Sequence, residues 1–439
     1  MLKQSVTKSN CLDIEAINET LCHSTLTEAA DMSDLSPYGN QHQIVEATAE
    51  NNEVVVTWHD KHVSRFHYGW LRENCPHPSS RHVKARERLV QPLSIAESIR
   101  PLRIAVDGSG ALWVIWNEAD KTDPSRHYQS RFHPGWLRAH CYTYPSGSSN
   151  LEAKALEPQP AYFRMRDASW EELVSSDESF YHWLKELGHT GWAVVRNVPH
   201  EEGACVRFGK RIGVVRESNF GYLFDVKSKA NPNSNAYTSF HLPLHTDMPH
   251  YELPPGIQLL HSMVNSARGG ESLLVDGLAV ADCLKREHPN AFQILTTQTV
   301  PYRFQDDDSD YVARHLVIEC DHLGNPRYIN WSNSTSAPLD IEHSRMEAMR
   351  SAIRLFIKTL ENPRFRIERK LDAGEMLVFD NRRMLHGRNA FDTTTGDRHL
   401  QGCYLDTSEF RSRLNVLARR FGSGSESEKS RPIQTAKMT

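Results

Sequence analysis

The sequence has no apolar run approaching the roughly 18 residues that a membrane-spanning helix needs. It also lacks an excess of charge of one sign, because 51 Lys and Arg against 55 Asp and Glu give a net charge of −4, and it has no long basic block of the kind that binds nucleic acid. Its eight cysteines are scattered without a C-x-x-C pair, and its N-terminus has no apolar segment of a secretory signal. We therefore expect an intracellular, cytoplasmic protein that keeps its thiols reduced and has no nucleic-acid or membrane partner.

The composition of the 439 residues changes along the chain and divides it into parts. Residues 1–45 are polar and aperiodic, which predicts a flexible leader, and residues 421–439 are rich in Ser, Gly and Lys, which predicts a disordered tail. Between them we expect a small β-rich domain over 46–150 and a larger domain over 160–415.

An internal repeat marks the first of these domains. Residues 64–75, SRFHYGWLRENC, recur at 130–141 as SRFHPGWLRAHC, with nine of twelve positions identical. Each copy follows an apolar run typical of a strand, VVVTW at 54–58 and LWVIW at 112–116. Two strand-then-turn units within one small domain favour a mostly β fold.

The larger domain combines strands with a few supporting helices. Residues 167–191 have a capping start, helical apolar spacing and a terminal glycine, and 191–198 predict a strand. Residues 344–362 predict an amphipathic helix that packs on the core through Met346, Met349, Ile353, Phe356, Ile357 and Leu360. Two further strands, FRIERKL (365–371) and EMLVFDN (375–381), are expected to form a hairpin through the turn at Gly374.

One histidine and one acid, His245 and Asp247, are candidates for a metal site. Residues i and i+2 of a strand point to the same face, so both side chains could bind one ion, although a lone H-x-D pattern is common by chance. A second histidine, His386, lies 386 − 245 = 141 residues further on, and Arg398 follows it by twelve. Two histidines and one carboxylate form the facial triad of non-haem Fe(II) oxygenases, and an arginine can bind a carboxylate in bidentate fashion.

Four stretches carry a resemblance to a known family: HTDMPHYELPPGIQLLH (245–261), GGESLLVDG (269–277), FDNRRMLHGR (379–388) and RHLQGCYLD (398–406). Over about residues 50–410 the chain resembles the γ-butyrobetaine and trimethyllysine dioxygenases, within the taurine-dioxygenase-like Fe(II)/2-oxoglutarate oxygenases. The resemblance implies a catalytic domain folded as a double-stranded β-helix, or jelly roll, preceded by a small β-rich domain.

The resemblance also implies the roles of the site residues. His245, Asp247 and His386 would be the catalytic Fe(II) ligands, Arg398 would bind the far carboxylate of 2-oxoglutarate, and Ser272 would assist it. Such an enzyme uses O₂ to oxidise a C–H bond and releases succinate and CO₂. Its substrate would be a small zwitterionic amine or amino acid, and family members are commonly homodimers, so a homodimer is an open alternative to a monomer.

Some residues that match the family's substrate pocket differ in type from those that the family carries. Phe220, Phe224, Tyr237 and Tyr404 match an aromatic cage that binds trimethylammonium through cation–π contacts. However, Phe224 occupies a position where the family carries Trp, and Phe220 one where it carries Tyr, so both could be simple pocket-wall residues.

The carboxylate end of the expected substrate also matches the family imperfectly. Ser234 falls where a substrate-binding Asn is expected, although Asn233 and Asn235 flank it. Asn330 and Asn333 are further candidate donors. Two alternatives to hydroxylation of γ-butyrobetaine therefore stay open: a biosynthetic oxygenase that desaturates or cyclises an amino acid-like substrate, and a catalytically inactive sensor of 2-oxoglutarate.

The family's structural zinc is in doubt here. Related proteins commonly bind it through three closely spaced Cys and a distant His. In this sequence Cys75 is retained, His77 and Ser80 replace the other two Cys, and His127 matches the distant His. The pattern favours loss of the zinc, and an unusual site formed by Cys75, His77, His82 and His127 is the alternative.

Overall fold

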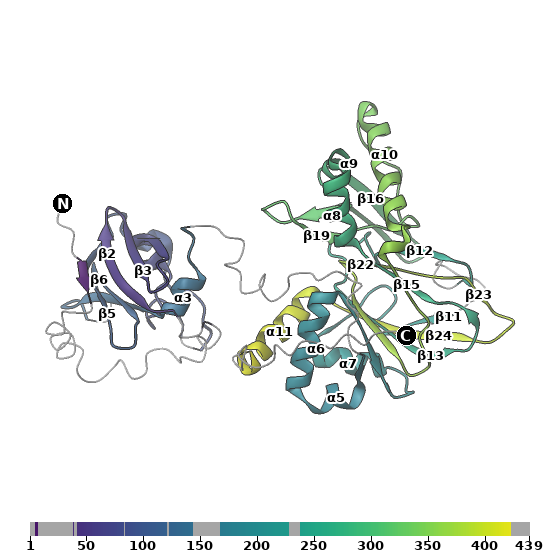
Figure 1. Ribbon diagram of the computed structural model, residues 1–439, viewed down its shortest axis with the longest axis horizontal. Helices are drawn as coiled ribbons and strands as arrows, with labels where there is room; N and C mark the ends of the chain where they lie inside the picture. The colour runs from purple at the N-terminus through teal and green to yellow at the C-terminus, as the bar shows by residue number, and fades with distance from the viewer. Residues whose placement is uncertain are drawn as a thin grey trace, which may run out of the picture. The chain divides into compact units, whose positions relative to one another are not determined.

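The computed structural model describes residues 5–7, 38, 42–82, 84–120, 123–143, 167–227 and 238–422. The chain divides into two compact units, Met1–Lys154 with Arg419–Thr439, and Ala155–Ala418 (Figure 1). The predicted leader and tail fall almost wholly outside the described residues. Within those residues no helix is long and apolar enough to cross a membrane, and the six cysteines there are free thiols.

The N-terminal unit contains two small antiparallel sheets, as the β-rich prediction for this part of the chain expects. One has the order β1-β2-β3-β4 and the other β5-β6-β7, and β4 and β7 each lead directly into a short helix. The bounds are β1 (Ser5–Thr7), β2 (Ile44–Glu50), β3 (Glu53–Trp58), β4 (Val63–His67), α2 (Tyr68–Glu73), the 3₁₀ helix η2 (Pro92–Ser94), β5 (Pro101–Val106), β6 (Leu112–Ala119), β7 (His127–Phe132) and α3 (Pro134–Ala139).

The sequence repeat corresponds to a structural repeat in this unit. In the first copy the Trp58 indole N–H donates to Ser64 Oγ at 2.8 Å, and in the second the Trp116 indole N–H donates to Ser130 Oγ at the same distance. Trp58 and Trp116 are both almost fully buried in one shared core. Identical residues therefore make the same contacts in both copies, so packing of the core accounts for the repeat and no catalytic role of these residues is needed.

The second unit is built around two facing sheets, which are antiparallel apart from the parallel pair of β8 and β9 in the larger one. The larger has the order β10-β24-β13-β21-β9-β8, with β11 also paired to β24, and the smaller has the order β12-β22-β15-β20. The predicted jelly roll, mostly β with supporting helices, is confirmed. The strand bounds are β8 (Ala168–Ser169), β9 (Trp192–Arg196), β10 (Val215–Arg216), β11 (Phe224–Lys227), β12 (Leu242–His245), β13 (Ile257–Asn265), β15 (Ser272–Asp276), β20 (Arg366–Arg369), β21 (Met376–Asp380), β22 (Met384–Arg388) and β24 (Arg398–Leu405).

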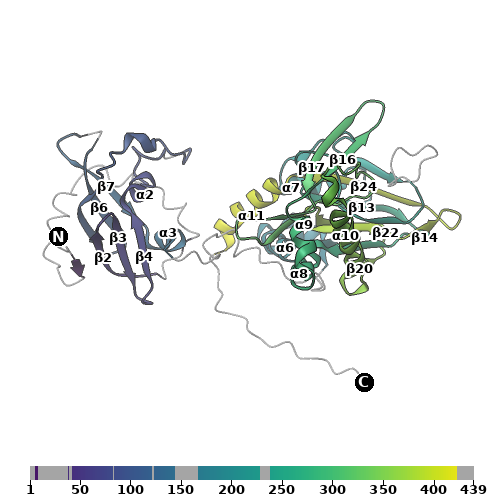
Figure 2. The ribbon, with the colours of Figure 1, turned by 90° about the horizontal axis from the view of Figure 1, so that it is seen from above.

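Helices and three two-stranded sheets, two of them hairpins, surround these sheets. Helix α7 packs on β13 and β24, whereas α8, α9 and α10 contact one another and form a separate cluster (Figure 1). The hairpin of β16 and β17 projects from the unit (Figure 2). The bounds are α5 (Trp170–Ser175), α6 (Asp177–Thr190), α7 (Ala204–Ile212), α8 (Gly277–Glu287), α9 (Pro289–Leu295), α10 (His343–Leu360), η4 (Pro363–Phe365), α11 (Thr407–Phe421), β14 (Arg268–Gly269) with β23 (Phe391–Asp392), β16 (Thr299–Gln305) with β17 (Asp310–Leu316), and β18 (Ile318–Cys320) with β19 (Pro326–Ile329).

Two expected helices are present, one of them with a break. Helix α10 buries Met349, Phe356 and Leu360, so the predicted apolar face is confirmed. The helix expected over 167–191 is divided into α5 and α6, because the Ser176 side chain accepts the Ser179 N–H and caps a new helix.

The hairpin predicted around Gly374 is wrong. Strand β20 pairs with β15 in the smaller sheet, whereas β21 pairs with β13 and β9 in the larger one. The Gly374 turn, with a φ of +82°, instead carries the chain from one sheet to the other. Its N–H donates to the Ser262 carbonyl and its carbonyl accepts the Val198 N–H, which anchors the crossing on neighbouring segments.

Candidate active site

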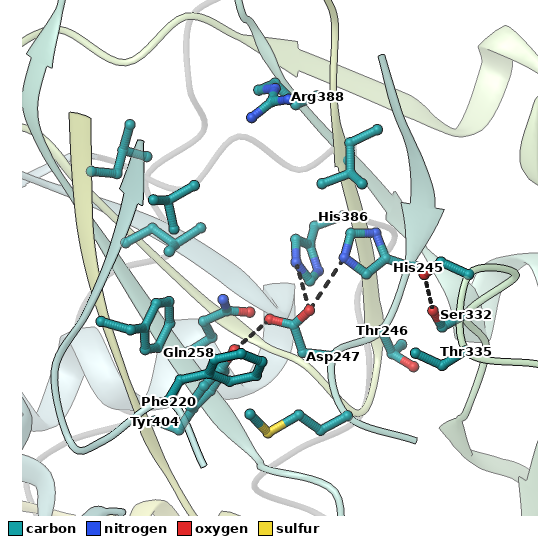
Figure 3. Close-up of a pocket in the computed structure, with 18 of the residues that line it drawn as sticks. Phe220, His245, Thr246, Asp247, Gln258, Ser332, Thr335, His386, Arg388 and Tyr404 are labelled. Carbon is teal, nitrogen blue, oxygen red and sulfur yellow. Dashed lines mark hydrogen bonds and ion pairs between the residues drawn. The ribbon is translucent and has the colours of Figure 1, made fainter. Parts of the chain in front are cut away.

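Three side chains with metal-binding atoms converge between the two sheets. His245 ends β12 and lies directly opposite His386 on β22, and their ring centres are 4.3 Å apart. Asp247 follows two residues after His245. The candidate ligand atoms of the three residues lie within 4.8 Å of one another, the one such group of His, Cys, Asp or Glu in the described part of the chain (Figure 3).

The histidine nitrogens that face Asp247 are the ones a metal would use. His245 Nε2 and His386 Nε2 lie 3.2 Å and 3.6 Å from Asp247 Oδ1. On its other side, His245 Nδ1 is 2.8 Å from the carbonyl oxygen of Pro243. Because a carbonyl only accepts, Nδ1 carries the proton and Nε2 presents its lone pair to the site. Two imidazole nitrogens and one carboxylate oxygen suit Fe(II) and leave further coordination positions open.

Asp247 is held on both its backbone and its carboxylate. The Tyr404 hydroxyl donates to Asp247 Oδ2 at 2.6 Å, which leaves Oδ1 directed toward the histidines. Asn381 is fully buried, and its Oδ1 accepts the Asp247 N–H at 2.7 Å while its Nδ2 donates to the carbonyls of Asp247 and Pro255. These bonds stabilise a tight bend in which Met248 has a φ of +58°. Asn381 was not predicted from the sequence as a site residue, although its position directly after the apolar strand β21 was a usable signal.

The charges of the three residues depend strongly on one another. Burial alone would raise the pKa of Asp247, but the electrostatic interaction with His386 and the hydrogen bond with His245 outweigh it and hold that pKa well below its usual range. Burial lowers the pKa of His386 to about 3, with His245 adding to the effect. For His245, burial is outweighed by the hydrogen bond and charge of Asp247, which raise its pKa. The carboxylate of Asp247 is therefore ionised and the His386 ring is neutral, which are the forms of these two side chains that bind a metal.

Two buried arginines line the same pocket. Arg398 begins β24 and Arg388 ends β22, where it pairs in register with Ser272 of β15. Burial, together with the charge of Arg388, lowers the pKa of Arg398 to about 9, and burial lowers the pKa of Arg388 to about 10. Arg398 Nε has no hydrogen-bond partner among the described residues. Because a buried cation without an anion is costly, this end of the pocket favours a carboxylate ligand.

The arginines and the aromatic residues occupy different sides of the pocket. In Figure 3, Arg388 lies on one side of the triad, and Phe220 and Tyr404 lie on the other. The Phe224 ring stacks on Tyr404 with centres 4.9 Å apart, and Phe220 meets Phe304 edge-on at 5.7 Å. Phe220, Phe224 and Tyr404 all line the pocket, and so does Phe304, which the sequence analysis did not single out.

The structure does not bring every candidate residue to the pocket. The Asn330 side chain is not among the pocket-lining residues, because its amide donates to Glu319 Oε1 at 2.7 Å and to the Leu316 carbonyl at 3.1 Å. The segment that follows it lines the pocket instead, through Ser332, Ser334 and Thr335. Asn233 and Tyr237 lie outside the described residues.

The candidate zinc residues do not form a cluster in this structure. Cys75 Sγ accepts the His77 N–H at 3.4 Å, while His77 Nδ1 is 2.9 Å from Ser79 Oγ. His82 Nδ1 accepts the Ala85 N–H, and His127 is exposed. No group of three ligand side chains meets within 4.8 Å in the part of this unit that the structure describes. Loss of the zinc stays a prediction.

Comparison with known proteins gives consistent matches along the chain. Residues 152–404 match the family described as taurine catabolism dioxygenase TauD, TfdA family, and residues 45–125 match gamma-butyrobetaine hydroxylase-like, N-terminal. The chain is 42% identical over 371 residues to the gamma-butyrobetaine dioxygenase of Pseudomonas sp. (strain AK-1), covering 83% of this chain and 94% of that one.

More distant relatives cover a similar length. Identity is 31% over 382 residues to the gamma-butyrobetaine dioxygenase of Homo sapiens, covering 84% of this chain and 95% of the relative. It is 26% over 395 residues to the trimethyllysine dioxygenase of Meyerozyma guilliermondii, covering 86% and 96%. The similarity therefore extends through both matched regions.

Proposed function

The chain belongs to the TauD, TfdA family of dioxygenases, and from this premise we propose that it hydroxylates γ-butyrobetaine. The class of enzyme follows from the family: it is an Fe(II)/2-oxoglutarate-dependent dioxygenase that oxidises a C–H bond of a small zwitterion. The similarity to γ-butyrobetaine dioxygenases favours hydroxylation over desaturation or cyclisation. One observation carries the proposal of substrate: an aromatic wall and the His245/Asp247/His386 group share one pocket.

The metal and cosubstrate end of the proposed site consists of the residues already described. His245, Asp247 and His386 would hold Fe(II), and Tyr404 would keep Asp247 in the orientation that this requires. The chemistry supplied by bound Fe(II) is the coupling of 2-oxoglutarate decarboxylation and O₂ reduction to oxidation of a C–H bond. Arg398 would bind the far carboxylate of 2-oxoglutarate in bidentate fashion, with Ser272 beside it.

The substrate end of the proposed site suits a cation that carries methyl groups. The rings of Phe220, Phe224 and Tyr404 offer faces to a trimethylammonium group, which loses little hydration on burial. Apolar side chains that line the same pocket, such as Leu400, exclude water from the reacting carbon. Each of these contacts orients one C–H bond toward the metal position, and none has to move a proton.

Product analysis tests this proposal. Protein loaded with Fe(II) and 2-oxoglutarate is incubated in air with γ-butyrobetaine or with γ-aminobutyrate, which keeps the chain and lacks the methyl groups. We expect γ-butyrobetaine to gain one oxygen and γ-aminobutyrate to be a much poorer substrate, since an ordinary ammonium is more strongly hydrated. A product lighter by two hydrogens, or equal use of the two compounds, would contradict the proposal.

A further inference from the structure

His250 is a buried histidine in the pocket that the proposed chemistry does not use. Its side chain is 4% exposed, and neither ring nitrogen has a hydrogen-bond partner among the described residues. The ring stacks on Phe304 with centres 5.2 Å apart, and the residue lines the pocket three positions after Asp247. A buried imidazole without partners destabilises the free protein, because its lost hydration is not replaced.

The simplest alternative is that His250 only fills the aromatic wall. The same chain provides an instructive comparison in His261, which is fully buried on β13 and also has no partner for either ring nitrogen. Missing partners alone therefore do not mark a binding residue. His250 differs from His261 because it lines the pocket, whereas His261 does not.

A second polar group that lines the pocket, the hydroxyl of Thr335, is in the same situation. Thr335 lines the pocket, and its Oγ1 is buried without a partner in the described part of the chain. The carbonyl of Thr335 accepts the N–H of Arg303, which directly precedes Phe304, so Thr335 and His250 both adjoin Phe304. Figure 3 shows Thr335 next to Ser332. Two independent segments, the turn after β12 and the loop after β19, thus each bring to the pocket a donor that has no partner among the described residues.

The charges of the pocket indicate which kind of group these donors would bind. The arginines that line it are Arg388 and Arg398, and Asp247 belongs to the metal group. The segment around Phe304 contributes no charged side chain to the described pocket lining. Burial lowers the pKa of His250 to about 4, so its ring is neutral near pH 7 and keeps one N–H to donate. A neutral ring also tolerates a cationic ligand nearby, which a protonated histidine would repel.

We propose that His250 and Thr335 form the subsite that hydrogen-bonds the carboxylate of the zwitterionic substrate. The N–H of the His250 ring and the hydroxyl of Thr335 donate to the two carboxylate oxygens, while Phe304 supports the histidine ring. Hydrogen bonds to an ionised acceptor are the stronger kind, so neutral donors suffice for a carboxylate that stays charged. This inference rests on the proposed function, because it assumes a substrate with a carboxylate at one end and a cation at the other.

The test compares two ligands that share one cation. Calorimetry on the protein with Fe(II) and 2-oxoglutarate, without O₂, measures binding of γ-butyrobetaine and of butyltrimethylammonium, which has no carboxylate. The variants His250→Phe and Thr335→Val keep size and remove the donor. The matched control is His261→Phe, which makes the same change in a buried histidine outside the pocket.

We expect His250→Phe and Thr335→Val each to weaken γ-butyrobetaine binding by about tenfold or more, and to leave butyltrimethylammonium binding unchanged. His261→Phe should alter neither. Equal effects on both ligands, or no effect from either pocket variant, would overturn the subsite. If one variant does not fold, the other decides, since the two lie on different segments. If the wild-type protein binds 2-oxoglutarate but neither cation, the proposed function fails and the subsite is overturned with it.

Discussion

Replacing Tyr404 by phenylalanine removes one hydroxyl from the candidate metal site and keeps the ring. That hydroxyl donates to Asp247 Oδ2 at 2.6 Å, and the ring stacks on Phe224. A hydrogen bond to an ionised acceptor contributes about 1.5–3 kcal/mol, and about 1.4 kcal/mol corresponds to tenfold in affinity. Without it the Asp247 carboxylate can rotate, so Oδ1 is no longer directed toward the histidines. We expect metal affinity to fall by about ten- to a hundredfold, the range found when partners of metal ligands are removed.

The assay is titration with Mn(II), followed by the electron paramagnetic resonance signal of the free ion, so that no turnover is needed. The matched control is Tyr302→Phe, because Tyr302 is fully buried and its hydroxyl donates to the Asn330 carbonyl at 2.8 Å, away from the pocket. The control should cost about 1 kcal/mol of unfolding free energy and leave Mn(II) affinity unchanged. The reasoning is refuted if Tyr404→Phe binds Mn(II) as tightly as the wild type, or if both variants lose affinity equally.

Three other predictions concern the rest of the molecule. Asn381→Ala should lower the unfolding free energy by about 2–4 kcal/mol and weaken Mn(II) binding, as measured by urea denaturation and titration, because it leaves the buried Asp247 N–H unpaired; unchanged stability would contradict this. Burial would raise the pKa of Asp225, but the hydrogen bonds from His399 and Gln401, together with nearby positive charge, outweigh it and lower that pKa. The unfolding free energy of Asp225→Asn should therefore be lower than that of the wild type above about pH 4, and the difference should disappear as the pH falls through the lowered pKa of Asp225. A difference in unfolding free energy that grows in acid would contradict this prediction. Elemental analysis of purified protein should find far less than one zinc per chain, and stoichiometric zinc would contradict the predicted loss around Cys75.

Whether a residue of the candidate site could be predicted depended on how far along the chain its interaction partners lie. His245 and Asp247 were recognisable because their spacing is local, and His386 and Arg398 because a family resemblance linked distant segments. Asn381 follows an apolar strand, but the loop that it contacts lies more than a hundred residues away, so its position alone did not reveal its role. The same limit applies to His250, since its isolation from hydrogen-bond partners is a property of the folded chain.

For the fold, too, elements with a strong local pattern could be predicted, whereas pairings between distant segments could not. Helix α10 and the strands of the repeat were predictable because their apolar periodicity is strong. The turn at Gly374 was misassigned because a glycine at positive φ serves a hairpin and a crossing between sheets equally well. Only the pairing of β20 and β21 with different sheets separates the two cases. The Asn330 side chain was misplaced for a related reason: its partner Glu319 is brought close by the β18–β19 pairing.

The most direct test of the account is the rate of succinate formation from 2-oxoglutarate by the Fe(II)-loaded protein in air, with and without γ-butyrobetaine, and with His386→Ala as the control. We predict strong stimulation by γ-butyrobetaine in the wild type, one hydroxylated product per succinate, and no turnover in the variant. Slow succinate formation that γ-butyrobetaine does not change would contradict the proposal that this pocket is built for it.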